Sequence, residues 1–549
     1  MTHPMTVRTM ALYSLAEVDL SNRLLADYLQ NNTEVHDLFA HDPEEMLDRA
    51  RHARAGVDRT RLADALVTLQ QELGADARAV EYAQLLADPT TPVVTAGQQP
   101  GLLTGPLYTI YKAISALNVA RRLSTELGRP VVPVFWSATD DDDRNEVDHC
   151  GCWDQHTTLH ALHYPEAAGT PGQLVGNLPT ECYGEQVLTQ LMGYIDGLPY
   201  ADEVRELLQG TLTPSVDMGA WFNRIMAALF SRHGLVICDP RVPAVRELAA
   251  EIIRREIQAP LDSTARVNER ARVLRAAGYR PQLMKPVEVC NFFLLDEKRQ
   301  RVTYRDGMFY VAGTAYRAEE LLDWLAREPT RFTPNAVLRP VVQEYLLGSS
   351  LFIAGPNELG YWAELHPVFQ GFGIEMPPVM PRAGATLVPP AVARTLRQWH
   401  LNPLPVLFDY DQVRFDILRE EQPETVARGF HQGRTEIEQL VARLIPLVSD
   451  VDTTLAQSAL ATHQRLLNEL ERLERKTLKA VERQSSEQLA QLERVRVTLF
   501  PRRGLQERTL NIFSVMARYG LGFFDQLCEL MDQEEGRHLF IELTPGGDG

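Results

Sequence analysis

The sequence predicts an α/β fold built on a doubly wound parallel sheet, with insertions and a long helical arm. Four short apolar runs end in turn residues, and each is followed by a helical stretch: "TPVVTA" from residue 91, "RPVVPVFW" at 129–136, "GLVICDP" at 234–240 and "SSLFIAG" at 349–355. Strands that alternate with helices are typical of a parallel sheet. A chain of 549 residues is also too long for one hydrophobic core, so two or three domains are expected.

Changes of pattern along the chain predict its organisation. Residues 1–90 consist mostly of amphipathic helices and form the N-terminal helical part of the core. Residues 91–385 form the α/β core, and residues 386–549 form a C-terminal helical region.

Two segments interrupt the alternation of strands and helices in the core. The segment near 147–200 has several Gly and Pro turns and no long helix is expected there. The segment near 283–313 contains "RVTYRDGMFYVAG", in which an Asp-Gly turn separates two alternating β-rich runs, a strong hairpin signal. Both segments are predicted to be β-containing insertions.

The C-terminal region contains the predicted arm, at about 431–498. Neither Gly nor Pro occurs between residues 447 and 500, and leucines recur there mostly three or four residues apart. This pattern favours a long antiparallel helical arm or an imperfect coiled coil, whose apolar stripe would suit a second subunit. The alternative is a helix that folds back on its own domain.

Composition narrows the class of protein. The chain has 55 basic and 73 acidic residues, a net charge of −18, which argues against a nucleic-acid partner. No apolar run approaches the roughly 18 residues that a membrane span needs, and the start of the chain lacks the apolar core of a signal peptide. Six scattered cysteines suit a reducing compartment, so a cytoplasmic protein with a small-molecule or protein partner is expected.

The first candidate site is the loop "GQQPGLLTGP" at 97–106, between a strand and a helix. The free amides at the helix start beside Gly105 and Pro106 favour an anion, and glycines let a ligand approach the backbone. A tight turn with packing glycines and a surface lysine is the alternative. The candidate residues of this loop and the helix that follows are Gln98, Gln99, Gly101, Thr104, Gly105, Tyr108 and Lys112.

The second candidate site is the acidic loop "TDDDDRNEVDH" at 139–149, directly after a predicted strand. Open α/β sheets bind ligands at the carboxyl ends of their strands. Asp140, Asp141 and Asp143 there would hold Mg²⁺ or a substrate ammonium group. The alternative is a solvated loop.

Two further stretches carry candidate ligands. His149, Cys150, Cys152 and His156 are zinc-ligand types, but their spacing is unlike that of a zinc site, so we expect strand residues and no metal. The stretch 338–369 repeats the strand, glycine turn and helix of the first loop, and arginines near it are candidates to grip a carboxylate. Its candidate residues, with one further on in "PPVMPR", are Arg339, Glu358, Tyr361, Trp362 and Arg382.

Taken together, these stretches resemble one family, the cysteine ligase family BshC of bacillithiol biosynthesis. The matching segments are "GQQPGLLTGPLYTIYKAISA", "PVFWSATDDDDRNEV", "LRPVVQEYLL", "GPNELGYWAEL", "PPVMPR" and "LFPRRGLQER", and they lie between residues 94 and 510. The resemblance implies a Rossmann-like core with two connecting-peptide insertions and a coiled-coil domain that mediates homodimerisation.

The resemblance also implies the reaction: joining the carboxyl group of cysteine to the amine of glucosaminyl malate, the last step of bacillithiol synthesis. ATP, with Mg²⁺, is the natural activating donor, although the sequence does not establish it. We expect Lys112 to neutralise charge at an anion bound near Gly105, and the aspartates to orient an amine or a metal. Arg339 and Arg382 are candidates for the malate carboxylates.

One residue departs from the family pattern. The acidic loop of the family reads Glu-Asp-His-Asp, and Asp142 stands here in place of the histidine. A histidine can act as a general base near neutral pH, so either it is not essential or this chemistry differs. Two other functions stay open: a different nucleotidyl-transferring or synthetase-like enzyme on the same scaffold, and a non-catalytic dimeric scaffold.

Overall fold

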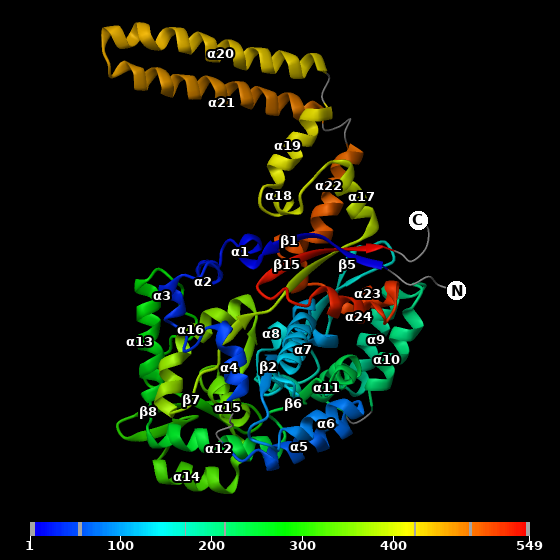
Figure 1. Ribbon diagram of the computed structural model, residues 1–549, viewed down its shortest axis with the longest axis vertical. Coiled ribbons are helices and arrows are strands. Elements are labelled where there is room, and N and C mark those ends of the chain that lie inside the picture. The colour runs from blue at the N-terminus through cyan, green and yellow to red at the C-terminus, as the bar shows by residue number, and fades with distance from the viewer. Residues whose placement is uncertain are drawn as a thin grey trace. The chain divides into compact units, whose positions relative to one another are not determined.

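The computed structural model describes residues 6–52, 57–170, 172–213, 216–421, 424–481 and 486–544 (Figure 1). The chain forms two compact units. The larger unit contains residues 1–387 and 505–549, and the smaller unit contains residues 388–504. The C-terminal segment 505–549 therefore packs with the larger unit, although it follows the smaller unit in sequence.

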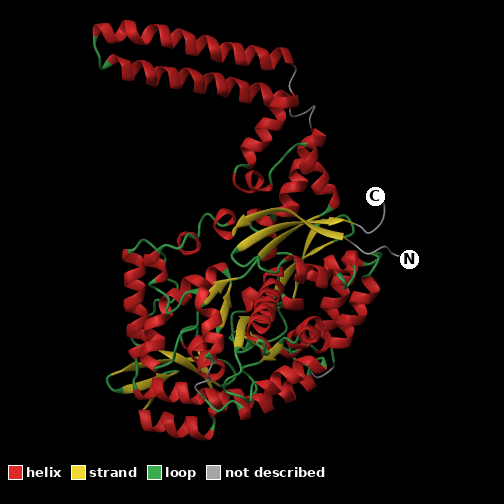
Figure 2. Ribbon diagram, in the orientation of Figure 1, coloured by secondary structure: helices red, strands yellow, loops and turns green. Residues whose placement is uncertain are grey.

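A five-stranded parallel sheet lies at the centre of the larger unit (Figure 2). Its strands, in spatial order, are β13 (Val379–Pro381), β12 (Leu351–Ala354), β2 (Val93–Gln98), β3 (Val132–Ser137) and β6 (Val236–Cys238). Each neighbouring pair is parallel. Nearly every residue of β2 and β3 is buried, as expected where helices cover both faces of a sheet. The predicted α/β fold with a doubly wound parallel sheet is confirmed.

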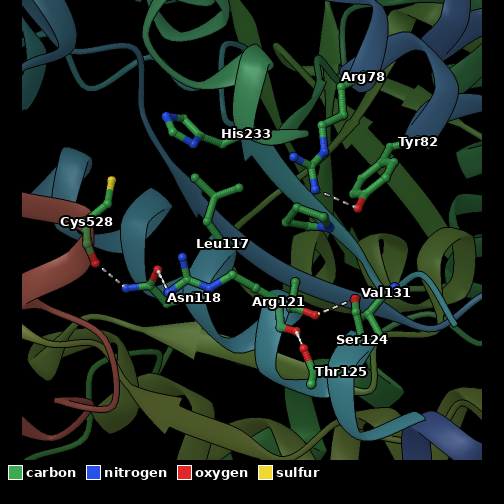
Figure 3. A pocket seen from close by; sticks show the side chains of 12 residues that line it. Arg78, Tyr82, Leu117, Asn118, Arg121, Ser124, Thr125, Val131, His233 and Cys528 are labelled. Atoms are coloured by element: carbon green, nitrogen blue, oxygen red, sulfur yellow. Dashed lines mark hydrogen bonds between the residues drawn. The ribbon is translucent and has the colours of Figure 1, made fainter. Parts of the chain in front are cut away.

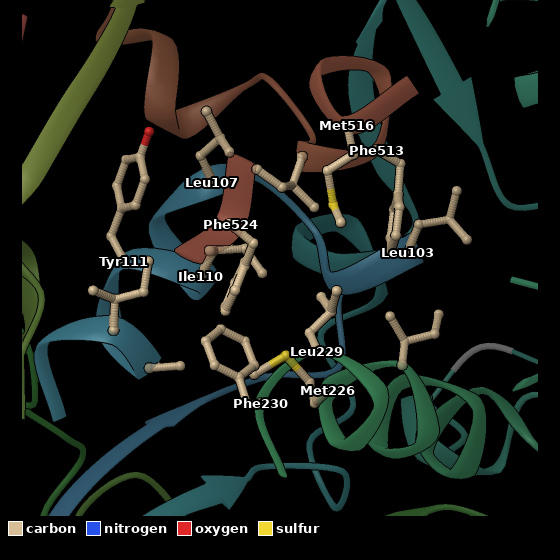
Figure 4. Packing of buried hydrophobic residues seen from close by; sticks show 14 of the residues in the cluster. Leu103, Leu107, Ile110, Tyr111, Met226, Leu229, Phe230, Phe513, Met516 and Phe524 are labelled. Atoms are coloured by element: carbon tan, nitrogen blue, oxygen red, sulfur yellow. The ribbon is translucent and has the colours of Figure 1, made fainter. Parts of the chain in front are cut away.

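Helix α7 (Leu107–Leu127) connects β2 to β3 and is buried for most of its length. Pro106 is the residue before its first turn, one position earlier than the sequence predicts. The start of α7 packs against α11 (Met218–Phe230), α23 (Ile512–Tyr519) and α24 (Phe523–Leu530) in a continuous apolar core. Figure 4 shows Leu103, Leu107 and Ile110 in this core with Phe230, from α11, and Phe513.

The two predicted insertions carry the other β structure. In the first, β4 (His149–Trp153) and β5 (Leu159–His163) form an antiparallel pair. The expectation of no long helix there is wrong, because α9 (Glu181–Ile195) follows the hairpin. In the second, β7 (Val289–Leu295), β8 (Arg299–Arg305), β9 (Met308–Val311) and β10 (Thr314–Tyr316) join β11 (Phe332–Pro334) in an antiparallel sheet. The predicted hairpin turn is confirmed, with Asp306 and Gly307 both at positive φ between β8 and β9.

The N-terminal region is mostly helical, and it also contains a strand that the sequence analysis did not predict. Strand β1 (Thr6–Ser14) pairs antiparallel with β15 (Arg537–Thr544), and β15 also joins β14 (Gly384–Val388). Helices follow: α1 (Leu15–Val18), α2 (Arg23–Leu29), α3 (Thr33–His36), α4 (Met46–Arg51), α5 (Thr60–Glu72) and α6 (Ala77–Leu85). A strand whose partner lies more than 500 residues away has no local signal beyond its alternation.

The remaining helices of the larger unit connect these sheets. They are α8 (Arg144–Val147), α10 (Ala201–Thr211), α12 (Pro243–Gln258), α13 (Asp262–Ala276), α14 (Ala318–Arg327), α15 (Leu338–Leu347) and α16 (Pro356–Phe372). Across the described residues of both units, no helix is both long and apolar enough to cross a membrane.

The smaller unit is helical and contains the arm. Its helices are α17 (Pro390–Gln398), α18 (Pro403–Phe408), α19 (Tyr410–Glu421), α20 (Glu424–Val451), α21 (Leu455–Val481) and α22 (Ser486–Leu499). Helices α20 and α21 pack against each other as an antiparallel pair. The carboxylate of Glu474, on α21, is buried and pairs with Arg434 of α20 and Arg419 of α19. The predicted coiled-coil arm is therefore confirmed.

Candidate functional site

The sheet order places one candidate site at the carboxyl ends of the strands. Chain connections from β2 lead to β3 on one side, whereas β12 lies on the other side of β2. The strand order therefore reverses between β2 and β12, which is where doubly wound sheets bind their ligands. Several predicted residues meet at this edge, and we call them, with one residue that was not predicted, the edge cluster: Gln98, Gln99, Lys112, Asp140, Asp141, Arg299, Arg339, Glu358 and Tyr361.

The ammonium group of Lys112 is enclosed by protein acceptors. Its Nζ lies 2.9 Å from the carbonyl oxygen of Gly97, 2.6 Å from Oε1 of Gln98 and 2.6 Å from Oε2 of Glu358. Burial lowers the pKa of Lys112, and the Glu358 carboxylate offsets part of that effect. Three acceptors match the three N–H groups of an ammonium, so Lys112 has no donor left for a ligand. Its place in the structure is to hold the loop after β2 against α16.

Glu358 and Tyr361 extend this network to Arg339. The Glu358 carboxylate also accepts from the backbone N–H of Gly355 (2.6 Å) and from the hydroxyl of Tyr361 (3.3 Å). Arg339 donates to the Tyr361 hydroxyl at 2.8 Å. Burial lowers the pKa of Arg339, but Tyr361 and Glu358 more than offset it, so the guanidinium stays charged. Within the described chain, its side chain makes no other hydrogen bond, so most of its donors remain available.

The acidic loop is organised by Asp141. Its Oδ2 accepts from the Gln99 amide at 2.9 Å, and its Oδ1 accepts from the backbone N–H of Asp142 and Asp143. Asp143 itself is exposed and caps α8 by accepting from the N–H of Asn145. The structure thus gives Asp141 and Asp143 structural hydrogen bonds and joins the loops after β2 and β3.

Arg299, which the sequence analysis missed, neutralises the acidic loop. Its guanidinium comes from β8 of the second insertion and lies 3.8 Å from Asp140, 3.7 Å from Asp141 and 3.2 Å from Asp142. It also lies 4.8 Å from the ring centre of Phe293. No local signal identifies this arginine, because the aspartates are some 157 residues away in sequence. The charge of Asp142, where the family pattern has histidine, is thereby paired.

Asp140 differs from its neighbours. It is only 3 % exposed, yet its carboxylate accepts no hydrogen bond from any described residue and meets Arg299 only at 3.8 Å. A buried carboxylate without hydrogen bonds is costly, so such a group is an acceptor awaiting a donor. It also interacts electrostatically with the guanidinium of Arg339, across the edge cluster. An unbonded carboxylate and an arginine with open donors together suit a ligand that carries an ammonium and a carboxylate.

The helix start predicted to bind an anion is closed by protein. Gly101, Thr104 and Gly105 are buried, and the Asn511 side chain donates to the carbonyl oxygens of Leu103 (2.6 Å) and Gly105 (2.8 Å). The first free amide of α7, at Leu107, is likewise taken by the carbonyl of Leu510. We therefore remove Gly101 and Gly105 from the ligand-binding residues, whereas the buried hydroxyl of Thr104 has no partner among the described residues and stays a prediction.

The glycines of this loop serve packing instead. A Cβ on Gly101 would lie 2.7 Å from Cα of Gly105, and Gly105 has a φ of +71°. Both positions require glycine for the turn itself. Tyr108, on the first turn of α7, is partly exposed, and burial with the nearby Glu146 raises its pKa to about 12.

Two other predicted residues also lie in the interior. Trp362 is fully buried and packs on Phe352 with ring centres 4.4 Å apart. Arg382 is buried and pairs with Glu507 at 2.6 Å and 3.0 Å, from the C-terminal segment. Both are committed to the core, so we withdraw the predictions that they contact substrate.

The cysteine and histidine stretch forms strand β4. Cys150 and Cys152 are buried, and burial raises the pKa of both thiols. The ring of His149 stacks on that of His163, its partner on β5. Nowhere in the described ranges do three or more His, Cys, Asp or Glu side chains gather as a metal site would require.

The residues predicted for ATP and Mg²⁺ do not fit those groups. A bound Mg²⁺ needs oxygen ligands, but the carboxylates of the acidic loop already share a guanidinium. A phosphate at the start of α7 would meet Leu510 and Asn511 rather than free amides. Neither a nucleotide nor a metal is therefore assigned to these residues.

Comparison with known proteins shows the family. Residues 5–383 match the family model of the bacillithiol biosynthesis BshC N-terminal Rossmann-like domain, and residues 385–543 match that of the BshC C-terminal coiled-coil domain. A protein of Salinibacter ruber named "Putative cysteine ligase BshC" is 32% identical over 527 residues, covering 94% of this chain and 96% of its own.

Other relatives bear the same name. One from Symbiobacterium thermophilum is 32% identical over 495 residues, 87% of this chain and 89% of its own. One from Bacillus cereus ATCC 14579 is 29% identical over 527 residues, 95% of this chain and 98% of its own. The chain belongs to the BshC family of bacillithiol biosynthesis.

Proposed function

We propose that this chain forms the amide between the carboxyl group of cysteine and the primary amine of glucosaminyl malate. Family membership and the names of the relatives support a cysteine ligase. The observation that carries the finer proposal is the buried Asp140 carboxylate, which accepts no hydrogen bond in the described chain and lies at the carboxyl edge of the sheet. Its missing donor is the ammonium group of a substrate.

In this proposal, the charged residues of the edge cluster bind different groups of the substrates. Asp140 holds the reacting ammonium and accepts the proton that the nitrogen must lose before it attacks. Arg339, held by Tyr361, binds a substrate carboxylate with its open donors. Lys112, Gln98 and Glu358 keep the two loops in position.

The reaction needs an activating donor. Joining a carboxylate to an ammonium forms one C–N bond, and it releases one carboxylate oxygen and two protons, together the elements of water. ATP is the proposed donor that carries this oxygen away, and no residue of the edge cluster is assigned to it.

The test is a mass-spectrometric assay of the purified chain with cysteine and glucosaminyl malate, with and without ATP. We expect bacillithiol to form from the wild-type protein with ATP, and not from Asp140→Asn. Asp143→Asn is the matched control, because Asp143 lies in the same loop but is exposed and caps α8, a place that asparagine fills equally well. Product from Asp140→Asn at the wild-type rate would remove Asp140 from the site. Absence of product from every protein, with no binding of either substrate, would favour the non-catalytic scaffold.

We further propose that the arm pairs two copies of the chain. Apolar side chains are exposed along both of its helices: Leu440, Leu444, Leu447 and Val451 on α20, and Leu455, Leu460, Leu466 and Leu473 on α21. Leu447 is 62% exposed although it lies within a stripe with helical spacing. Two such hairpins would bury both stripes in a four-helix bundle. Light scattering should show a dimer that Leu444→Glu with Leu447→Glu converts to monomers; a monomeric wild type would refute the pairing.

A further inference from the structure

Two cavities lie away from the edge cluster. In the first, the polar side chains of the lining find their partners within the protein. A hollow of about 380 Å³ is lined by the second half of α7 and by neighbouring segments (Figure 3). The amide of Asn118 donates to the carbonyl of Cys528 at 2.9 Å, and the hydroxyl of Ser124 accepts from the N–H of Val131 at 2.9 Å. None of the buried side-chain atoms that lack a partner among the described residues belongs to this lining. Its polar groups satisfy one another, so nothing there requires a ligand.

The second cavity has a volume of about 500 Å³, and its lining includes buried polar atoms without a partner among the described residues. Gly348, Ser349 and Ser350, which directly precede β12, line it together with Glu344 and Tyr345 of α15. Because β12 runs from Leu351 to Ala354, this cavity lies at the amino end of the strand, opposite to the edge cluster. Residues 41–52 and the turn after α16 complete its lining. Such a volume suits a small molecule.

The buried part of this lining contains the carboxylate of Glu344 and the hydroxyl of Ser350. Glu344 is 2% exposed, and its carboxylate accepts only from neutral groups: the Gln343 amide at 2.9 Å and the N–H and hydroxyl of Ser349 at 2.8 Å and 3.1 Å. Burial raises the pKa of Glu344, and the hydrogen bonds from Gln343 and Ser349 and the charge of Arg49 offset only part of that effect. Ser350 is also 2% exposed, and its hydroxyl has no partner among the described residues.

The charges around this lining are acidic in balance. The carboxylates are those of Glu45, Asp48, Glu344 and Glu375, and the arginines are Arg49 and Arg255. Arg49 is bound to Glu375 at 2.5 Å, and Arg255 is bound to Glu251 at 2.8 Å. Both arginines are therefore bound to other carboxylates, and Glu344 makes no ion pair within the described residues, although the charge of Arg49 acts on it from farther away. The Nε of Arg49 still lacks an acceptor.

We propose that this cavity is a second binding site, which takes the primary ammonium group of a small polar molecule on Glu344 and Ser350. An ammonium donates to both the carboxylate and the unpartnered hydroxyl, and it supplies the directly bonded cation that Glu344 does not have among the described residues. A hydroxyl or carboxylate on the same molecule accepts from Arg49 Nε. Amino sugars and amino acids both carry this combination. The site is independent of the proposed ligase reaction, because none of its residues belongs to the edge cluster.

The experiment is calorimetric titration of the full chain with glucosamine and, separately, with L-serine. It is done in the Asp140→Asn background, so that binding at the edge cluster does not contribute. N-acetylglucosamine, which has the same ring but no ammonium, is the matched probe. Variants Glu344→Gln and Ser350→Ala are added, with Asp48→Asn as a control that removes an exposed carboxylate of the same lining.

We expect at least one of glucosamine and L-serine to bind one-to-one, and the one that binds identifies the source of the ammonium. Glu344→Gln should weaken binding by at least tenfold and Ser350→Ala by several-fold, while Asp48→Asn stays within twofold and N-acetylglucosamine gives no heat. Ser350→Ala removes only a hydroxyl, so it tests the site even if Glu344→Gln folds poorly. Absence of binding by both amines, or equal binding after Ser350→Ala and Glu344→Gln, would overturn the proposal. Neither result would bear on bacillithiol formation.

Discussion

Two loops at the same edge of the central sheet are both candidate sites in sequence, but their polar groups have different partners in the fold. In the loop after β2, the backbone carbonyls of Leu103 and Gly105 and the amide of Leu107 are all bonded to the C-terminal segment. In the loop after β3, Asp140 is equally buried but accepts no hydrogen bond from any described residue. In the first loop, the protein itself supplies the partners of these backbone groups. In the second loop, the Asp140 carboxylate can accept hydrogen bonds only from a donor outside the described chain.

The difference between these two loops indicates which features identify a ligand-binding site. Glycines, glutamines and a helix start describe both a packed turn and an anion site, so they do not discriminate between them. A carboxylate that accepts no hydrogen bond is a stronger sign than an unpartnered hydroxyl such as that of Thr104 in the first loop, because its charge makes the missing partner more costly. Lys112 and Arg339 differ in a similar way. The ammonium of Lys112 is bonded to three acceptors, whereas the guanidinium of Arg339 makes one side-chain hydrogen bond.

The largest effect is expected at Asp140. Asp140→Asn should lower kcat/KM by about 10³-fold, because a buried charge-assisted contact to the substrate is lost. Thermal unfolding should shift little, since in the free protein the Asp140 carboxylate has no hydrogen bond to lose and only the 3.8 Å ion pair with Arg299. A fall in Tm of several degrees together with unchanged kinetics would place Asp140 with the closed loop instead.

Arg339→Lys should have the next largest effect. A lysine keeps the charge but not the forked donors, so KM for the substrate that carries the gripped carboxylate should rise about 10- to 100-fold. Steady-state kinetics with each substrate varied in turn would identify that substrate. Unchanged KM for both would show that the open donors of Arg339 face solvent only.

Gly101→Ala should affect stability and not substrate binding. The new methyl group would lie 2.7 Å from Cα of Gly105, so the free energy of unfolding should fall by about 1–3 kcal/mol. Gly193→Ala, on α9, is the matched control, because a Cβ there has open space and helical backbone. Denaturant unfolding measures the free energy of unfolding of both variants. If Gly101→Ala is as stable as the wild type but has a raised KM, the first loop is a binding site after all.

The smallest effect is a pH dependence of the closed region. His538 of β15 is fully buried beside Glu507 and Arg382, and burial lowers its pKa to about 4, with Glu507 opposing and Arg382 adding to the shift. The unfolded chain takes up this proton below about pH 6.5 and the folded chain does not, so stability falls as pH decreases.

Between pH 6.5 and 5.5 the loss attributable to His538 should be about 1 kcal/mol. Unfolding of the wild type and of His538→Asn at the two values measures it as the difference between their changes. Equal changes in the two proteins would mean that His538 is protonated in the folded state, paired with Glu507.

The sequence by itself determined the fold class, the hairpin of the second insertion and the helical arm. Each of these depends on a local period of apolar residues or on a turn dipeptide such as Asp306-Gly307, which short-range physics dictates. It also predicted that Lys112, Asp140 and Glu358 each follow a strand, and the carboxyl ends of parallel strands lie at the same edge of the sheet.

Only the tertiary structure determined which of those groups keep hydrogen-bonding capacity for a ligand. Arg299 reaches the acidic loop from another sheet, and Asn511 closes the first loop from the C-terminal segment. Trp362 and Arg382 look like ligand contacts in sequence and are core residues in the fold. Hydrogen-bond satisfaction depends on partners hundreds of residues away, so neither the weakly paired carboxylate of Asp140 nor the unpartnered hydroxyl of Ser350 has a signature in the sequence.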